Sequence, residues 1–129
     1  MAWARQTDAS LVKPLEGAIV RRYTAGATIE AGEAVCMSAD GFVDPASGAA
    51  VTTNFVLGIA LQDVAVTNRV DVVVFGPVVM ATGGTPGAHL YISDTAGEGA
   101  ETAGTKVGII GIVESATVVF VNPAKISQS

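Results

Sequence analysis

Gly-Glu-Ala-Val-Cys-Met-Ser at residues 32–38 returns later in the chain as Gly-Ala-His-Leu-Tyr-Ile-Ser at residues 87–93. Each copy is followed by a glycine-bearing turn, a stretch of small residues and then a run that ends in Gly-Ile, at residues 58–59 and 111–112. The copies share strand and turn signals, and no acid, base, nucleophile or metal ligand recurs in them. The repeat therefore predicts a duplicated piece of architecture.

The composition around the repeat favours short strands over helices. The chain has 129 residues, of which 50% are hydrophobic but only 5% aromatic, and it contains 15 glycines. This length suits one domain with one compact core, and abundant Val, Thr and Gly favour strands and turns. No segment shows sustained helical spacing of apolar residues, and none approaches the ~20 consecutive apolar residues of a membrane span.

Short strands are expected to follow one another along the whole chain. Alternation in the second motif places Leu90 and Ile92 inward and His89 and Tyr91 outward. The glycine-rich loop at residues 96–105 is expected to be exposed and mobile. The predicted strands are residues 17–23, 34–37, 41–43, 55–61, 70–75, 78–80, 88–93, 106–114 and 117–122, with an interruption at Gly76-Pro77.

These strands predict an all-β fold, a small antiparallel β-barrel or β-tulip with two pseudo-repeated strand-turn units and an extended N-terminal arm. Closure would bury strongly β-forming runs such as residues 72–75, which aggregate when they are left as open edges. We divide the chain into an N-terminal arm with an edge strand (1–25), a β-barrel domain (26–124) and a C-terminal tail (125–129).

The arm at residues 1–16 lacks a clear period and contains Pro14, so we expect it to become ordered on binding. Its start has no apolar core followed by a cleavage site, which argues against a secretory signal. The strand at residues 17–23 mixes apolar and basic residues on both faces. That pattern is typical of an edge that something outside the chain must cover.

The charge is unevenly distributed, and the net charge is −5. Residues 1–33 balance basic against acidic side chains, whereas acidic side chains dominate residues 34–129. Direct nucleic-acid binding is not expected, because it needs a contiguous cationic surface. Arg21 and Arg22 are interpreted either as a solvated strand edge or as a contact to an acidic protein partner.

Residues that carry chemistry are sparse. His89 and Cys36 are the only histidine and cysteine, so an internal disulfide and zinc sites built on these ligands are excluded. Cys36 is expected to be a small buried hydrophobe. Asp40 and Asp44 suit turn caps, with a calcium site as the alternative. The glycines of residues 83–87 lack the Lys-Ser/Thr of a phosphate loop. We expect no enzyme, no cofactor and no metal.

The order of the motifs carries a resemblance. Ala-Gly-Glu-Ala-Val, Ser-Ala-Asp-Gly-Phe-Val-Asp-Pro-Ala and Val-Leu-Gly-Ile-Ala precede Val-Asp-Val-Val-Val-Phe-Gly-Pro-Val, Thr-Pro-Gly-Ala-His-Leu-Tyr-Ile-Ser and Lys-Val-Gly-Ile-Ile-Gly-Ile-Val-Glu-Ser. This series resembles the small capsid decoration, or cement, proteins of tailed bacteriophages over residues 26–122. Each motif is structural and loose by itself, so the resemblance depends on their order.

The resemblance implies a β module on the outer surface of the virion capsid, made in the host cytoplasm. There it stabilises the head by clamping neighbouring major capsid protein subunits, as a homotrimer at three-fold and quasi-three-fold positions, with no membrane partner. Two alternatives stay open. One is a homo-oligomeric β module of a phage head fibre or tail, and the other is a carbohydrate- or ligand-binding barrel with Tyr91 and His89 at its pocket.

We expect the arm to make the capsid contact, with two apolar anchors, three arginines paired to capsid carboxylates and a tyrosine beside them. Its backbone would add a strand to a capsid edge. Folding of Trp3 back onto the barrel is the alternative. The candidate interface residues are Trp3, Arg5, Leu11, Arg21, Arg22 and Tyr23.

Overall fold

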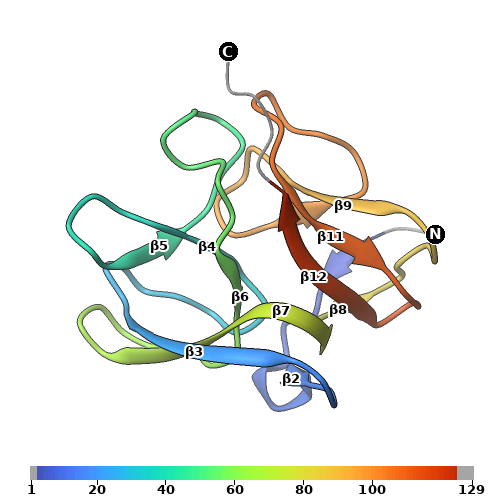
Figure 1. The fold of residues 1–129 in the computed structure, drawn as a ribbon, viewed down its shortest axis with the longest axis horizontal. Helices are drawn as coiled ribbons and strands as arrows, with labels where there is room; N and C mark the ends of the chain where they lie inside the picture. The colour runs from blue at the N-terminus through green and yellow to red at the C-terminus, as the bar shows by residue number, and fades with distance from the viewer. Residues whose placement is uncertain (1–2, 125–129) are drawn as a thin grey trace.

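The computed structural model describes residues 3–124 and confirms an all-β, barrel-like fold (Figure 1). Within these residues the one helical element is a 3-10 turn, η1 (Ala9–Leu11), and no helix is long and apolar enough to cross a membrane. The tail expected at residues 125–129 lies outside the described residues. The strands are β1 (Ala4–Arg5), β2 (Lys13–Pro14), β3 (Ile19–Thr24), β4 (Ala34–Met37), β5 (Val43–Pro45), β6 (Gly58–Ala60), β7 (Arg69–Val79), β8 (Ala81–Thr82), β9 (His89–Ile92), β10 (Gly99–Ala100), β11 (Ile109–Val113) and β12 (Val118–Ala124).

The strand order shows that the repeated sequence is a repeated fold unit. Hydrogen-bonded neighbours follow the order β10-β9-β11-β12-β7-β6-β4-β5, and each of these pairs is antiparallel. Read inward from β5, this order gives a first unit, β5-β4-β6-β7. Read inward from β10, it gives a second unit, β10-β9-β11-β12. The two units join where β7 pairs with β12. The two motif copies, β4 and β9, hold the same place in the two units.

Glycines occupy matching positions in the two units. The motif glycines Gly32 and Gly87 have φ values of 89° and 88°, which lie in the left-handed region that glycine adopts without strain. The Gly-Ile runs supply a second matched pair. A Cβ on Gly58 would lie 2.1 Å from the carbonyl oxygen of Val73, and a Cβ on Gly111 would lie 2.0 Å from that of Phe120. The sequence repeat therefore marks the points where backbone approaches backbone.

β7 is a single long strand that runs through Gly76-Pro77, where the interrupted run was expected to bend, bulge or reach an edge before it continued. Gly76 has a φ of 110°, and a Cβ there would lie 2.7 Å from the Cα of Ala18. The register with β3 also shifts close to this point, between Ile19 and Val20. The strand bends and continues, so its first half pairs with β6 and its second half with β12. β7 thus connects the two units.

Loop hydrogen bonds bring the two ends of the strand order together. Gly97 donates to the carbonyl of Ala46 (2.6 Å) and accepts from the N–H of Ala34 (3.0 Å), and Gly48 donates to the carbonyl of Ser93 (2.7 Å). These bonds hold the segment after β5 against the segment between β9 and β10, and the sheet curls (Figure 1). The loop at residues 96–105, expected to be exposed, is in part strand β10 and is pinned to the body.

Buried side chains form two clusters on opposite faces of the strands. The larger one fills the space enclosed by both units and includes Leu90, Ile92 and Cys36, as the alternation predicted. The smaller one lies between β3, β4, β5, β6 and the first half of β7 and includes Val35. Burial raises the pKa of the Cys36 thiol, with the charge of Asp44 adding to the effect. Cys36 is therefore a packing residue.

The N-terminal segment lies along the sheet over residues 3–24. β1 pairs with β8, and both β2 and β3 pair antiparallel with β7. Between them, the N–H of Leu15 donates to the carbonyl of Pro77 (3.0 Å). Residues 13–24 thus follow β7 along its length.

Candidate partner-binding surface

Asp40 in the turn before β5, and Asp44 within β5, accept hydrogen bonds from nearby backbone and hydroxyl groups. Asp40 accepts a hydrogen bond from the N–H of Phe42 (2.9 Å), and Asp44 accepts one from the hydroxyl of Ser38. Among residues 3–124, no group of three or more His, Cys, Asp or Glu side chains is arranged to hold a metal ion.

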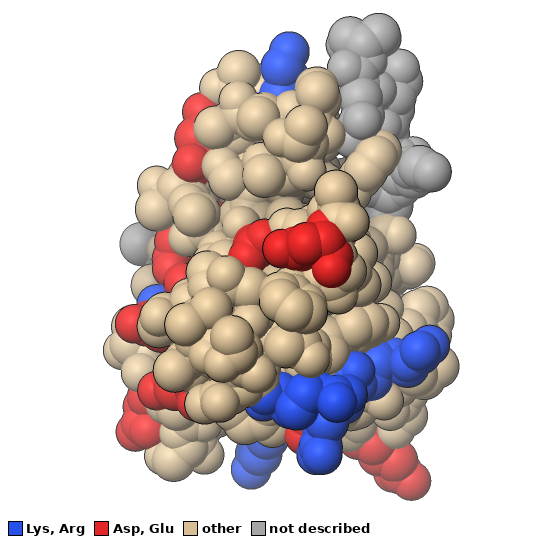
Figure 2. Space-filling model, turned by 90° about the vertical axis from the view of Figure 1, so that its left-hand side faces the viewer, with Lys and Arg blue, Asp and Glu red and all other residues tan. Residues whose placement is uncertain are grey.

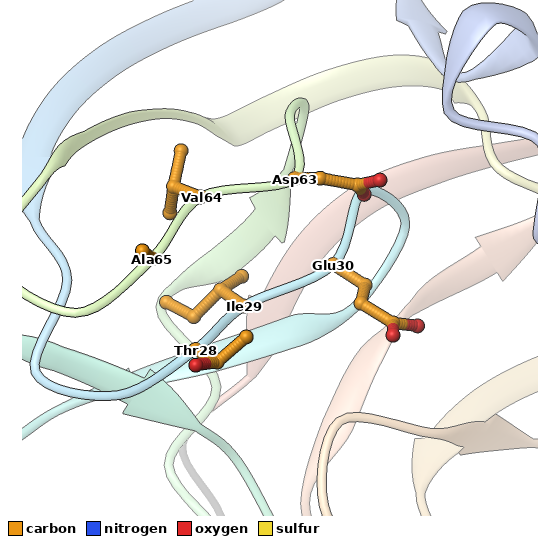
Figure 3. Close-up of a pocket in the computed structure, with 6 residues that line it drawn as sticks. All are labelled: Thr28, Ile29, Glu30, Asp63, Val64 and Ala65. Carbon is orange, nitrogen blue, oxygen red and sulfur yellow. The ribbon is translucent and has the colours of Figure 1, made fainter.

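A surface hollow of about 310 Å³ lies between the loop before β4 and the loop after β6 (Figure 3). Buried Ile29 contributes to its lining, with Glu30 and Asp63 among the polar residues. Asp63 accepts a hydrogen bond from the N–H of Ala31 (2.8 Å), and Glu30 is paired with Arg5. Its carboxylates are thus already engaged inside the chain.

Another hollow, of about 160 Å³, lies on the outer side of β9, β11 and β12. His89 and Ile112 line it and are direct cross-strand partners. The rings of His89 and Tyr91 lie 6.1 Å apart, tilted by 33°. The outward placement expected for both residues is found, since His89 is exposed and Tyr91 is half-buried.

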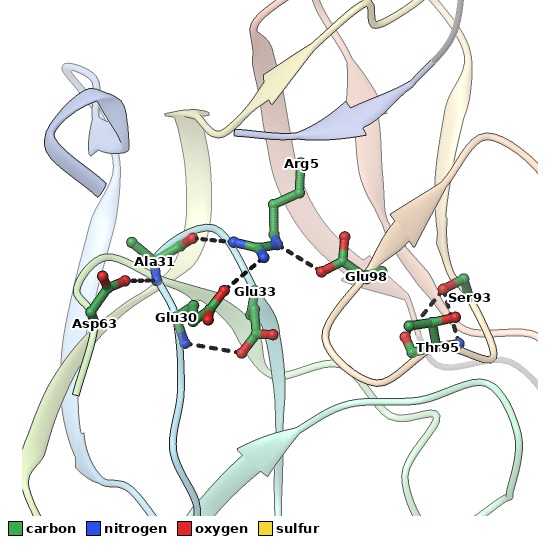
Figure 4. A network of polar contacts seen from close by, with 8 residues as sticks. All are labelled: Arg5, Glu30, Ala31, Glu33, Asp63, Ser93, Thr95 and Glu98. Atoms are coloured by element: carbon green, nitrogen blue, oxygen red, sulfur yellow. Dashed lines mark hydrogen bonds and ion pairs between the residues drawn. The ribbon is translucent and has the colours of Figure 1, made fainter. Parts of the chain in front are cut away.

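Arg5 is enclosed by the chain's own acceptors (Figure 4). Its guanidinium donates to Glu98 (2.7 Å), Glu30 (2.8 Å) and the carbonyl of Ala31 (3.0 Å), and its side chain is 10% exposed. Burial works against its charge, but the hydrogen bond and the charge of Glu98 leave the pKa of Arg5 above its ordinary value. The structure uses Arg5 internally, in place of the expected pairing with capsid carboxylates.

Glu33 lies beside this cluster and accepts a hydrogen bond from the N–H of Glu30 (3.0 Å). Burial raises the pKa of Glu33, and the negative charges of Glu30 and Glu98 act in the same direction. The charge of Arg5 and the backbone hydrogen bond oppose that shift without cancelling it. The ionised carboxylate of Glu33 therefore lowers the stability of the folded protein.

Trp3 folds back onto the barrel, which is the alternative considered for it. Its ring packs against the larger core cluster, and the side chain is half-buried. The indole Nε1 is buried with no hydrogen-bond partner among the described residues. Trp3 and Arg5 therefore fasten the N-terminal segment to the barrel.

A different part of the segment is uncovered. Large apolar side chains are exposed in η1, between β2 and β3, at the start of β3, and on the part of β7 that lies opposite the start of β3. Ile19 is 52% exposed and Leu11 is 50% exposed. Phe75 lies opposite Ile19 in the register and meets the ring of Phe120 edge-on, with 5.1 Å between centroids. The exposed apolar residues of this surface are Leu11, Leu15, Ile19, Val20 and Phe75.

Basic side chains adjoin these apolar ones. Arg21 and Arg22 are exposed in the middle of β3, and Thr24 pairs with Arg69 at its end. Figure 2 shows basic side chains gathered in a band across the lower part of one face, with acidic side chains above and below it. We call the exposed side chains of η1 and of residues 13–22, together with Phe75, the β3 surface.

The two arginines differ in their contacts. Arg22 Nε lies 2.8 Å from Asp71 Oδ1, and this hydrogen bond lowers the pKa of Asp71. Arg21 lies over the ring of Tyr23, 6.0 Å from its centroid. Tyr23 is half-buried and packs against the smaller core cluster. The β3 surface thus contains three of the candidate residues, Leu11, Arg21 and Arg22, with Tyr23 at its base.

Sequence reasoning missed Leu15, Ile19, Val20 and Phe75 as surface residues. The mixed faces of residues 17–23 were the available signal, because apolar and basic side chains alternate there on both sides of one strand.

No protein-family model matches the sequence, and no curated protein matches it.

Proposed function

We propose that this protein is a structural virion protein that binds the outside of a tailed-phage capsid and stabilises the shell. It bridges major capsid protein subunits, as trimers at three-fold and quasi-three-fold positions. The observation that carries this proposal is the β3 surface, where exposed apolar side chains before and at the start of β3 adjoin two exposed arginines in its middle. A surface of that composition on a molecule of net charge −5 suits an acidic protein partner.

The geometry also supports a mechanical role. The barrel is closed by backbone hydrogen bonds between the two units, and the N-terminal segment is fastened to it through Arg5 and Trp3. A small rigid body of this kind contributes to a shell through binding energy alone. Contacts to several subunits at once multiply modest single-site affinities.

Co-sedimentation with undecorated, expanded heads of the source phage tests the proposal, with the bound copies counted per capsid subunit. We expect saturation near one copy per capsid subunit. Few copies per particle, or no binding, would refute the decoration assignment and instead indicate a module of a head fibre or tail.

A double charge reversal localises the contact. Arg21→Glu with Arg22→Glu should weaken head binding at least tenfold, because both arginines are exposed on the β3 surface. The matched control is Lys106→Glu with Thr102→Glu and Ala103→Glu, which changes the net charge equally and leaves β3 and the adjacent Arg69 unchanged. Equal loss of binding in both variants would show that net charge, and not the β3 surface, governs attachment.

A further inference from the structure

The outer edge of β3 is open. β3 pairs with β7 along one edge, and no second strand among residues 3–124 pairs with its other edge. An unpaired edge presents a row of backbone donors and acceptors to any extended segment that approaches it. This edge is distinct from the side chains of the β3 surface, since it is a property of the backbone.

The register with β7 identifies the backbone groups on this edge. The N–H of Asp71 donates to Gln62 (2.8 Å) and its carbonyl accepts from Leu61 (2.9 Å), both next to β6. Arg22 lies opposite Asp71, so in an antiparallel pair its own N–H and carbonyl point away from β7. Val20, two residues earlier, has the same direction.

The open edge has defined ends. On the N-terminal side, Pro14 in β2 has no N–H to offer to an added strand. On the C-terminal side, the chain turns toward β5, where Gly26 donates to the carbonyl of Val43 (2.8 Å) and Ala25 bridges the same residue. The free edge is therefore β3 itself, a length that suits one short strand.

The charge of β3 selects its occupant. Arg21 and Arg22 alternate, so both faces of the strand carry positive charge. If β3 paired with β3 of a second copy around a two-fold axis, each arginine would lie opposite or diagonal to an arginine of the other copy, which is unfavourable. An extended segment with carboxylates would instead meet complementary charge on both faces.

We propose that β3 accepts an added strand from an extended, acidic segment of the capsid subunit. The inference rests on the proposed function for the identity of the partner, but the open edge and its charge are properties of this chain alone. The competing interpretation is that the arginines only guard the edge against aggregation.

Amide hydrogen exchange on the intact protein tests the mode of binding. In the free protein, the amides of Val20 and Arg22 should exchange quickly, whereas those of Arg21 and Tyr23, directed at β7, should exchange slowly. On saturated heads, the amides of Val20 and Arg22 should become protected by at least tenfold. Head binding with no new protection at these amides would overturn strand addition while the proposed function stands.

A peptide probe tests the edge without the capsid. The probe is a blocked heptapeptide, Thr-Glu-Glu-Val-Glu-Glu-Thr, whose carboxylates lie on both faces when it is extended, and binding is measured by titration calorimetry. We expect binding that weakens at least tenfold when the three central residues of the peptide are N-methylated, since methylation removes backbone donors and keeps the charge. A peptide with lysines in place of the glutamates should bind at least tenfold more weakly.

The two experiments together separate the possible failures. Peptide binding that survives N-methylation would refute an added strand in favour of simple charge attraction. Peptide binding that depends on the backbone donors of the peptide, without any head binding, would retain the acceptor edge and refute the capsid assignment. Absence of both peptide binding and amide protection on heads would leave Arg21 and Arg22 as guards of the edge and refute the inference.

Discussion

Arg5 shows how one side chain fastens a two-residue strand to two loops. β1 pairs with β8 through only two residues, but the guanidinium of Arg5 reaches the loops at Glu30 and Glu98, one from each fold unit. Charge-assisted hydrogen bonds of this kind are stronger than neutral ones, and a buried acceptor left without its donor is costly. The hydrogen bonds of Arg5, more than the two-residue pairing of β1 with β8, therefore hold the N-terminal segment in place.

Arg5→Met should lower the free energy of unfolding by about 1–3 kcal/mol, because it removes the donors of two partly buried hydrogen bonds, to Glu98 and to the carbonyl of Ala31, and keeps the apolar stem. Denaturant unfolding measures the change. Arg21→Met is the control, since Arg21 is exposed, and should stay within ~0.5 kcal/mol of the wild type. Equal effects of the two substitutions would contradict the internal role of Arg5.

Glu33→Gln should raise the free energy of unfolding at pH 7. The pKa of Glu33 is raised in the folded protein by burial, so its ionised form opposes folding above that pKa. As the pH falls through the raised pKa toward the ordinary value of 4.5, wild-type Glu33 takes up a proton and the advantage of the variant disappears. Denaturant unfolding at pH 7 and pH 4 measures both states.

The exposed Glu16 provides the comparison for this pH effect. Glu16→Gln should differ from the wild type by the same small amount at both pH values. A Glu33→Gln advantage that is constant with pH would show that the charge of Glu33 is not its cause.

At the scale of elements, each fold unit depends on one glycine in its third strand along the chain, β6 in the first unit and β11 in the second. Gly58→Ala and Gly111→Ala should each destabilise the protein by more than about 2 kcal/mol, because the added Cβ meets a backbone carbonyl that no rotamer change can move. Thermal unfolding should show similar losses for both, as expected for equivalent positions. In the control Gly99→Ala, the new Cβ meets only the flexible side chain of Leu90, at 3.2 Å, and the loss should be small.

The elements that sequence reasoning predicted well are those set by local pattern. β4 matches the predicted residues 34–37. The hairpin of β11 and β12 turns at Ser115-Ala116, between the predicted strands 106–114 and 117–122. β6 is shorter than the predicted residues 55–61. The chain forms strand hydrogen bonds only where Gly58, which has no side chain, allows its backbone to approach β7. β5 begins after Gly41, whose φ of 86° keeps that residue in the turn.

At the scale of the whole molecule, long-range contacts decided what local pattern could not. The closure through Gly97, Ala46 and Ala34 joins residues far apart in sequence, and it lies in a loop whose composition indicated exposure. The role of Arg5 depends in the same way on loops that lie 25 and 93 residues away. Arg21 and Arg22 were recognisable from the sequence, because alternation along one strand is a local signal.

Deletion of residues 1–12 should lower the melting temperature by more than about 5 °C, because it removes β1, the core contact of Trp3 and the hydrogen bonds of Arg5. Thermal unfolding followed by circular dichroism measures the shift. A melting temperature equal to that of the full chain would show that this segment contributes nothing to the barrel. Any loss of head binding by this deletion must therefore be compared at a temperature where both proteins are folded.

The N-terminal segment gives a doubled molecule a single direction. The two fold units are alike in their strand order, but residues 13–24 lie along β7 alone, the last strand of the first unit. A particle docked by β3 would therefore point the same loops outward at every position on a shell. The exposed turn at Ala39-Asp40-Gly41, where a Cβ on Gly41 would meet nothing within 4 Å, is then an insertion point that displays a foreign peptide in one orientation on every copy.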